Sequence, residues 1–353
     1  MKLRGVETWR ESVPLTRPYT LSRATYDHVD LFFVRITTEG GLAGFGSASP
    51  AEDVTGETPE ACEKGLGALA AHDWAGTEAF ALGERLLDLD GVADTPPAAR
   101  AAFDMALHDL AARALGIPLV GLWGQVHASL PTSITIGIKS PADTVEEARE
   151  YRDRGFRHLK IKLGRDIDED LERLHRVREE MGTDAAIRVD ANEGYDAAAL
   201  RRILEATRSL DLEFVEQPFP RGEEDMLNGL TPDERALIGL DESVHDPDDA
   251  WSRRETKVGG WIVKLMKCGG LGPARRIADL ARFRRNWLMW GCMDESRLSI
   301  AAALHVALSC PATRYLDLDG HLDLASDPFQ GGFVLEEGCL ALTSAPGLGC
   351  QPA

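Results

Sequence analysis

Eight short apolar segments, separated by charged stretches with helical periodicity, occupy the chain between residues 132 and 319. Parallel strands need a crossover connection, which is usually a helix, so this alternation predicts βαβ units. Eight such units in succession predict a closed βα barrel rather than an open sheet. The expected strands are 132–138, 158–164, 185–190, 212–216, 236–241, 261–265, 287–291 and 314–319.

The residues on either side of these segments follow other patterns. A β-rich run at 31–38, a Gly-Gly turn and a second apolar run predict a hairpin. Helical spacing at 59–71, 76–89 and 97–115 then predicts an α+β domain for residues 1–125. Residues 321–353 lack a final helical pattern, so we expect extended structure that returns to cover this domain.

Charge and cysteine content narrow the class of protein. The 353 residues include 39 Lys and Arg against 58 Asp and Glu, which argues against nonspecific nucleic-acid binding because that binding needs clustered basic residues. Six cysteines are spread without a CxxC pair and are expected to be reduced thiols. The chain shows neither a signal-peptide pattern nor an apolar run of the ~20 residues that span a membrane, so we expect a cytoplasmic protein without membrane contact.

Ionisable residues end five consecutive expected strands, from the second to the sixth. They are Lys160 with Lys162, then Asp190, Glu216, Asp241 and Lys264. Each step is about one βα unit long, so the side chains should converge on the rim where barrel active sites lie. Three carboxylates are hard oxygen ligands suited to Mg²⁺, and the lysines are candidate proton carriers. Any one acid alone could be only a helix cap, but the ordered set favours a site.

Five motifs carry a resemblance to a known family. They are KIK at 160–162, VDAN at 189–192, VEQP at 215–218, LDES at 240–243 and IVKLMKCGG at 262–270. Together they resemble the enolase superfamily, and specifically its muconate-lactonizing subgroup. The resemblance implies a (β/α)7β modified TIM barrel at 126–320 with an N-terminal α+β capping domain at 1–125, completed by 321–353.

The resemblance also implies roles for the rim residues. Asp190, Glu216 and Asp241 would bind Mg²⁺, which holds a substrate carboxylate. Lys162 and Lys264 would face each other across the substrate α-carbon, and Lys160 would help to stabilise the enediolate. This agrees with the chemistry, since a proton α to a carboxylate is weakly acidic and its removal needs concentrated positive charge nearby.

An acid pair at the end of the eighth segment separates members of the subgroup. Alternation puts Asp317 and Asp319 on one face of the strand, where they could clamp a substrate ammonium. Asp-x-Asp at this place looks like the dipeptide epimerases of the L-Ala-D/L-Glu epimerase family, which bind the α-amino group of a dipeptide there; a pair of loop-capping acids is the alternative. Thr135, in the first segment, is also expected to bind the substrate.

We therefore predict an isomerase, a Mg²⁺-dependent dipeptide epimerase that acts by 1,1-proton transfer. The alternatives are an N-acylamino acid racemase or o-succinylbenzoate synthase, a muconate-type cycloisomerase, or a non-catalytic binding protein on the same barrel. Relatives commonly assemble into dimers or octamers, so a homo-oligomer is expected.

Four further positions are expected to set the side-chain preference, and a fifth lies beside a lysine. Ala24 stands where an alanine–glutamate epimerase presents an arginine, and Glu52 and Asp53 stand in a second capping loop. Asp294 follows the seventh segment, while Glu295 looks like the family glutamate near Lys264. The lost arginine at Ala24 and the added acids predict a preference for substrates with non-acidic, possibly cationic, side chains. If these acids are only solvated, the alternative is that hydrophobic dipeptides are accepted equally.

Overall fold

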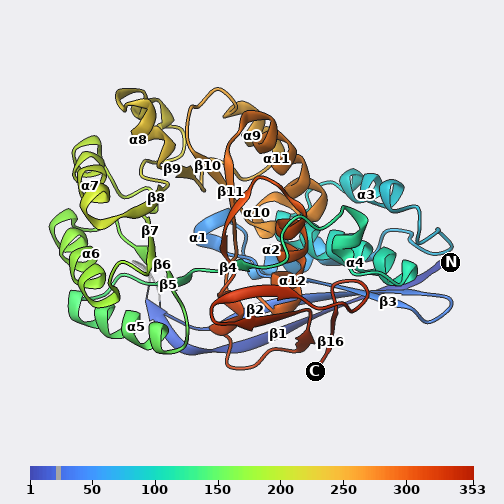
Figure 1. Ribbon diagram of the computed structural model, residues 1–353. Helices are drawn as coiled ribbons and strands as arrows, with labels where there is room; N and C mark the ends of the chain where they lie inside the picture. The colour runs from blue at the N-terminus through green and yellow to red at the C-terminus, as the bar shows by residue number, and fades with distance from the viewer. Residues whose placement is uncertain (21–24) are drawn as a thin grey trace.

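A barrel of eight parallel strands forms the centre of the molecule, and the computed structural model describes residues 1–20 and 25–353 of the chain (Figure 1). The strands follow one another around the sheet in chain order. They are β5 (Ile134–Ile136), β6 (His158–Lys162), β7 (Ala186–Asp190), β8 (Leu212–Glu216), β9 (Ile238–Leu240), β10 (Gly260–Val263), β11 (Trp287–Gly291) and β12 (Thr313–Asp317). A parallel bridge between Thr132 and Leu316 brings the first and last strands together.

Helices cover the outside of the barrel after each of its first seven strands. They are α5 (Pro141–Asp153), α6 (Ile167–Met181), α7 (Ala197–Leu210), α8 (Pro232–Ala236) with the 3-10 turn η2 (Glu224–Gly229), α9 (Pro247–Ser252), α10 (Leu265–Cys268) with α11 (Leu271–Arg284), and α12 (Arg297–Ser309). In the described part of the chain, the only helical element after β12 is the 3-10 turn η3 (Gly320–Leu322). The predicted (β/α)7β barrel is therefore confirmed.

An antiparallel sheet and four helices form the N-terminal domain. The sheet has the order β1 (Leu3–Thr20), β2 (Thr25–Thr38) and β3 (Ala43–Ala48), and the helices are α1 (Glu52–Thr55), α2 (Pro59–Ala70), α3 (Leu82–Gly91) and α4 (Pro97–Leu115), before the 3-10 turn η1 (Leu119–Leu122). Gly46 lets β3 lie directly on α4, because a Cβ there would stand 1.9 Å from the carbonyl oxygen of Ala102. The predicted hairpin, from the run at 31–38 to the apolar run at 42–46, is present as β2 and β3.

The C-terminal segment returns to the N-terminal domain as extended structure. It contains β13 (Phe329–Gly331), β14 (Phe333–Glu336), β15 (Cys339–Leu342) and β16 (Cys350–Pro352), and β15 pairs with β4 (Leu130–Pro131). Phe329 stacks on Phe33 of β2 at a centroid distance of 5.3 Å, and the backbone N–H of Leu348 donates to Asp109 of α4 at 2.6 Å. In Figure 1 these red strands lie beside the blue strands of the N-terminal sheet.

Two boundaries differ from those expected from the sequence. The helix predicted at 76–89 begins only at Leu82, because Gly76 has a φ of +74° and Glu78 forms a bridge with Lys2. The eighth strand ends at Asp317 rather than at residue 319, since Asp319 has a backbone φ of −98° and ψ of −11° at the start of η3. None of the helices in the described ranges combines the length and apolarity that crossing a bilayer would require.

Candidate active site at the mouth of the barrel

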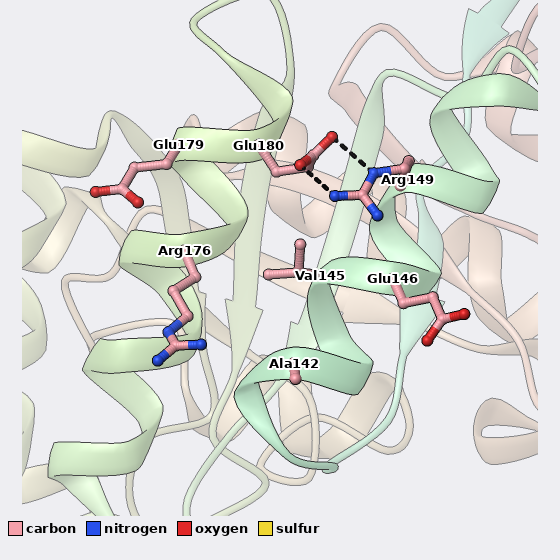
Figure 2. Close-up of a pocket in the computed structure, with 7 residues that line it drawn as sticks. All are labelled: Ala142, Val145, Glu146, Arg149, Arg176, Glu179 and Glu180. Atoms are coloured by element: carbon pink, nitrogen blue, oxygen red, sulfur yellow. Dashed lines mark hydrogen bonds and ion pairs between the residues drawn. The ribbon is translucent and has the colours of Figure 1, made fainter.

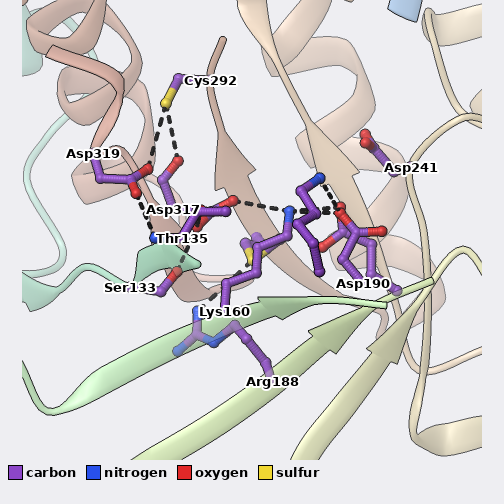
Figure 3. Close-up of polar contacts among 12 residues, drawn as sticks. Ser133, Thr135, Lys160, Arg188, Asp190, Asp241, Cys292, Asp317 and Asp319 are labelled. Atoms are coloured by element: carbon purple, nitrogen blue, oxygen red, sulfur yellow. Dashed lines mark hydrogen bonds and ion pairs between the residues drawn. The ribbon is translucent and has the colours of Figure 1, made fainter. Parts of the chain in front are cut away.

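Lys160 lies at the centre of the polar groups that the strand ends bring together (Figure 3). Its side chain is 2% exposed, and its Nζ lies 3.0 Å from Asp190, 2.9 Å from Glu216 and 3.0 Å from Asp317. Burial opposes the positive charge, but Asp190, Asp317 and Glu216 outweigh it and raise the pKa of Lys160 well above its usual value. The three carboxylates therefore hold Lys160 as the ammonium in this structure.

Lys162 and Lys264 lie on opposite sides of the barrel mouth. Lys162 ends β6, and Lys264 follows β10 directly as the first residue before α10. Three strands, β7 to β9, separate β6 from β10, which places the two lysines four strands apart in a ring of eight. Of the acids, Asp190 and Glu216 end β7 and β8, and Asp241 directly follows β9, so the three line one arc of the rim between the lysines.

Each of these two lysines is paired with an acid of that arc. Nζ of Lys162 donates to Asp190 at 2.7 Å, and Nζ of Lys264 donates to Asp241 at 2.8 Å. Burial disfavours the ammonium of Lys264, but Asp241 outweighs burial and raises the pKa of this lysine. Desolvation alone would have lowered this pKa toward that of a base, so the ion pair with Asp241 reverses the direction expected from burial.

The three carboxylates respond differently to their common burial. Burial favours the protonated form of each, but Lys160 and Lys162 lower the pKa of Asp190, and Lys264 with Lys267 lowers that of Asp241. For Glu216, burial and the neighbouring charge of Asp190 raise the pKa well above its usual value. At Glu216, burial and the negative charge of Asp190 therefore outweigh the positive charge of the nearby lysines.

These carboxylates fit a hard divalent cation by their chemistry, although they are turned toward the lysines. As the side chains stand, no three His, Cys, Asp or Glu groups in the described residues are close enough together to hold an ion. The Glu216 Oε2 atom, however, is buried and has no hydrogen-bond partner in this structure. Three buried carboxylates with such a free oxygen are the donor set that Mg²⁺ prefers, and each sits on a rigid strand end.

Asp317 and Asp319, at and just after the end of β12, form a second group of acids on the rim, called here the opposite arc. Both already have partners within the protein, so they are not free to bind a substrate ammonium together. The Oδ1 atom of Asp317 accepts from Ser133 Oγ at 2.5 Å, and its Oδ2 contacts Lys160. Asp319 Oδ2 accepts the backbone N–H of Thr135 at 2.7 Å. Burial and the charge of Asp317 raise the pKa of Asp319 well above its usual value, so a further cation beside Asp319 would be stabilising.

The expected specificity residues are distributed around the entrance. Ser49, just before α1, donates its hydroxyl to the backbone carbonyl of Asp294 at 2.7 Å, so the capping loop touches the loop after β11. Glu52 and Asp53 form the exposed first turn of α1 next to this contact. Ala24 lies outside the described residues.

Glu295 is buried behind Lys264. Its Oε1 accepts the backbone N–H of Met293 at 2.9 Å, and its carboxylate interacts electrostatically with Lys264, whose Nζ bonds Asp241 instead. Burial raises the pKa of Glu295 to about 7. The glutamate is therefore a buried acid near the lysine rather than its hydrogen-bond partner.

Lys267 and Gln217 hold the backbone around Asp241 and were not singled out from the sequence. Lys267 Nζ contacts Asp241 Oδ1 and donates to the carbonyls of Asp241 and Val244 at 2.7 and 3.0 Å. Gln217 Oε1 accepts the backbone N–H groups of Asp241 and Ser243 at 2.9 and 3.2 Å. The spacing of Lys264 and Lys267, three residues apart on one helical turn, was the available signal for Lys267.

A groove between α5 and α6 lies on the outer surface of the barrel and contains none of the predicted site residues. Arg149 and Glu180 form a two-point ion pair across it, at 3.1 and 2.7 Å (Figure 2). Solvated ion pairs of this kind contribute little binding energy, so the mouth of the barrel remains the candidate site.

Family models match nearly the whole chain. The model described as "Mandelate racemase / muconate lactonizing enzyme, N-terminal domain" matches residues 4–124, and "Enolase C-terminal domain-like" matches residues 143–353. The chain belongs to the enolase superfamily. The resemblance inferred from the five motifs is thereby confirmed.

Curated relatives of this chain include dipeptide epimerases and an N-succinyl-L-Arg/Lys racemase. The L-Lys-D/L-Arg epimerase of Methylococcus capsulatus is 50% identical over 99% of both chains, and the L-Ala-D/L-Glu epimerase of Bacillus subtilis is 33% identical over 99% of this chain and 96% of its own. A crystal structure of a dipeptide epimerase from Methylococcus capsulatus, complexed with Mg and L-Arg-D-Lys, covers 99% of both chains with 49% identity and a TM-score of 0.96. The predicted class of enzyme, an isomerase, is confirmed by these relatives.

Proposed function

We propose that the protein is a Mg²⁺-dependent dipeptide epimerase that inverts the α-carbon of the C-terminal residue of an L,L-dipeptide. The observation that carries this proposal is the placement of Lys162 and Lys264 on opposite strands, with three acids between them. A substrate carboxylate directed toward those acids would put its α-carbon between the two amines. Inversion needs a proton to leave one face and another to arrive at the other face.

The proton transfers follow from the two lysines. One lysine takes the α-proton as the neutral amine, and the opposite lysine returns a proton as the ammonium; the reverse reaction exchanges these roles. Lys160, which the carboxylates hold as the ammonium, stabilises the negative charge that develops on the substrate carboxylate. Mg²⁺ on Asp190, Glu216 and Asp241 would supply further positive charge to that carboxylate and would compete with the lysines for the same oxygens.

The acids of the opposite arc favour a dipeptide over an N-acylated amino acid. Asp319 is buried beside Asp317, and its raised pKa reflects a carboxyl group that lacks a compensating cation. The ammonium of a dipeptide would supply that charge. An N-succinylamino acid has no such ammonium, and its additional carboxylate would be repelled here.

The acids at the entrance support a preference for cationic side chains. Asp294 belongs to the loop that Ser49 contacts. Burial and the charge of Asp294 raise the pKa of Asp323 to about 7. Asp323 in turn acts on Asp319, so acidic groups gather on this side of the mouth. The relative that is 50% identical is named for Lys and Arg substrates, which agrees with this charge pattern. Glu52 and Asp53 on α1 would add to the same field.

Exchange of the α-proton in D₂O tests the reaction directly. We expect deuterium incorporation and epimerisation with L,L-dipeptides, and little of either with N-succinylamino acids. Exchange only with N-succinylamino acids would contradict the dipeptide assignment, and exchange with neither class would favour a binding protein.

Two variants test the two-base mechanism. Lys162→Ala and Lys264→Ala should each abolish epimerisation, while each still exchanges the α-proton of one epimer, because the opposite lysine remains. Near-normal epimerisation by either variant would refute the mechanism.

A further inference from the structure

We propose that Asp170, Arg173 and Tyr195 are positioning residues that fix the backbone of Lys162 and thereby set the efficiency of one of the two proton transfers. This inference rests on the proposed two-lysine function. None of the three side chains is among the groups that face the substrate in that proposal. All three are buried, with exposed fractions of 0%, 1% and 5%.

The first two residues bind the backbone on the C-terminal side of Lys162. Arg173 Nη1 donates to the carbonyl oxygen of Lys162 at 3.0 Å. Asp170 Oδ2 accepts the backbone N–H of Gly164 at 2.8 Å. Arg173 Nη2 and Asp170 Oδ1 form an ion pair, so the two contacts are joined by a buried charged bond. The peptide groups that follow the catalytic lysine are therefore held by side chains of α6.

Tyr195 connects this pair to the loop that follows Asp190. Its hydroxyl donates to Asp170 Oδ2 at 2.8 Å, and its backbone N–H donates to the carbonyl of Pro218 at 3.0 Å. Gly164 has a φ of +104°, and a Cβ there would stand 2.3 Å from the carbonyl oxygen of Ala191. The loops after β6 and β7 therefore touch each other at Gly164 and Ala191, and the three polar side chains join them.

Such a network has more contacts than an ion pair within a helix requires. Asp170 and Arg173 lie three residues apart on α6 and could pair there without touching the rim. Instead both also bond the segment 162–164, next to an amine whose distance from the α-carbon decides the rate. Misplacement of a reacting group by about 1 Å can cost about 100-fold in rate.

The effect should be confined to one proton transfer. Lys264 is held from another part of the barrel, where its carbonyl oxygen accepts the N–H groups of Lys267 and Cys268 at 3.1 Å. Loosening the loop after β6 should therefore slow exchange by Lys162 and leave exchange by Lys264 unchanged. General loss of structure would slow both.

Single-base backgrounds separate the two proton transfers. In Lys264→Ala, residual α-proton exchange in D₂O reports on Lys162, and in Lys162→Ala it reports on Lys264. We expect Tyr195→Phe, which removes only one hydroxyl, to lower exchange about 10-fold or more in the first background and less than about twofold in the second. Equal loss in both backgrounds, or no loss in either, would overturn the proposal.

Tyr151→Phe is the matched control. Tyr151 is also a buried tyrosine of the barrel, 6% exposed, whose hydroxyl donates to a carboxylate, that of Glu147 at 3.1 Å. Its removal should leave the ratio of the two exchange rates unchanged. An asymmetric loss in this control as large as that of Tyr195→Phe would also overturn the proposal.

A second variant guards against failure of the double variants to fold. In the otherwise native protein, Arg173→Lys keeps the positive charge but loses the forked contact, and it should slow exchange from one epimer more than from the other. Symmetric slowing would contradict the positioning role. The two proposals fail in different ways. The two-lysine function is refuted if Lys162→Ala and Lys264→Ala, each made alone, do not retain exchange of opposite epimers. If they do retain it and Tyr195→Phe slows both exchanges equally, only the positioning network is refuted.

Discussion

Lys160 and Asp317 form a buried ion pair, with Nζ 3.0 Å from Oδ2, that joins the two arcs of acids around the barrel mouth. The same ammonium contacts Asp190 and Glu216 on the other side. Asp317 is therefore already neutralised by the protein, and burial of its charge is outweighed by Lys160, which lowers its pKa. In the proposed reaction, Asp319 is left as the acid that would receive a substrate ammonium, so the two members of the Asp-x-Asp pair would have different roles.

The first prediction separates these two roles kinetically. Asp319→Asn should raise KM for a dipeptide about 10- to 100-fold with a smaller change in kcat, because it removes the charge that receives the ammonium. Asp317→Asn should lower kcat instead, since it frees Lys160 from its place beside the substrate carboxylate. Steady-state kinetics of both variants checks this, and matching effects on KM and kcat would show that the acids act as one clamp.

The second prediction concerns the stability that Lys267 gives to the site. Lys267→Met leaves Asp241 without one cation and leaves buried carbonyls without their donor, which should cost about 3–5 kcal/mol of unfolding free energy. Lys257→Met, at an exposed lysine, should stay within about 0.5 kcal/mol of the wild type. Chemical denaturation measures both, and a Lys267→Met variant as stable as this control would contradict the role.

The third prediction uses metal removal. Chelation by EDTA should abolish epimerisation, and Mg²⁺ should restore it. Mg²⁺ should also raise the Tm of the demetallated protein, because a ligand that binds only the folded state stabilises it by mass action. Asp190→Asn should reduce this Tm shift strongly. Full activity in demetallated protein would exclude the metal role, and an undiminished shift in the variant would exclude Asp190 as a ligand.

Much of the barrel could be predicted because its signals are local. Apolar strands and periodic helices repeat along the chain, and parallel strands bring their C-terminal ends to one rim, so the order of Lys162, Asp190, Glu216, Asp241 and Lys264 was enough to predict a site. The start of α3 was missed because a bridge between Glu78 and Lys2, which lies far away in sequence, replaced the first helical turn.

The contacts inside the site could not be read from the sequence in the same way. Lys160 touches acids on three different strands, and this depends on how the strand ends meet in space. The end of β12 before Asp319 is set by η3, so simple strand alternation did not apply to that residue. The lowered lysine pKa expected from burial was reversed at Lys264 by its tertiary partner Asp241.

The fourth prediction is a pH dependence of stability from Glu295. Burial raises its pKa from the usual 4.5 to about 7 in the folded protein, so the folded state binds the proton more tightly than the unfolded state does. Its contribution is therefore most favourable below pH 4.5 and falls by about 3 kcal/mol as pH rises to 7.

Glu295→Gln keeps the acceptor for the N–H of Met293 but removes the titration. The variant should therefore gain stability relative to the wild type between pH 5 and pH 8. Glu205→Gln, at an exposed glutamate, is the control and should show a flat difference. Unfolding free energies at several pH values give the result, and a flat difference for Glu295→Gln would contradict the raised pKa.

The last prediction concerns the substrate side chain. At an effective dielectric near 20, a charge at ~4 Å from Asp294 interacts by about 4 kcal/mol before desolvation, and ~1.4 kcal/mol already changes kcat/KM tenfold. We expect kcat/KM to fall in the order L-Ala-L-Lys, L-Ala-L-Leu, L-Ala-L-Glu, with L-Lys or L-Arg also favoured at the first position.

Asp294→Asn should reduce the preference for lysine over leucine about tenfold. Asp184→Asn makes the same charge change at an exposed aspartate before the N-terminal end of β7, far from the barrel mouth, and should leave the order unchanged. Highest activity with L-Ala-L-Glu would refute the preference, whereas an unchanged profile in Asp294→Asn would assign the preference to Glu52 and Asp53, to be measured with Glu52→Gln and Asp53→Asn.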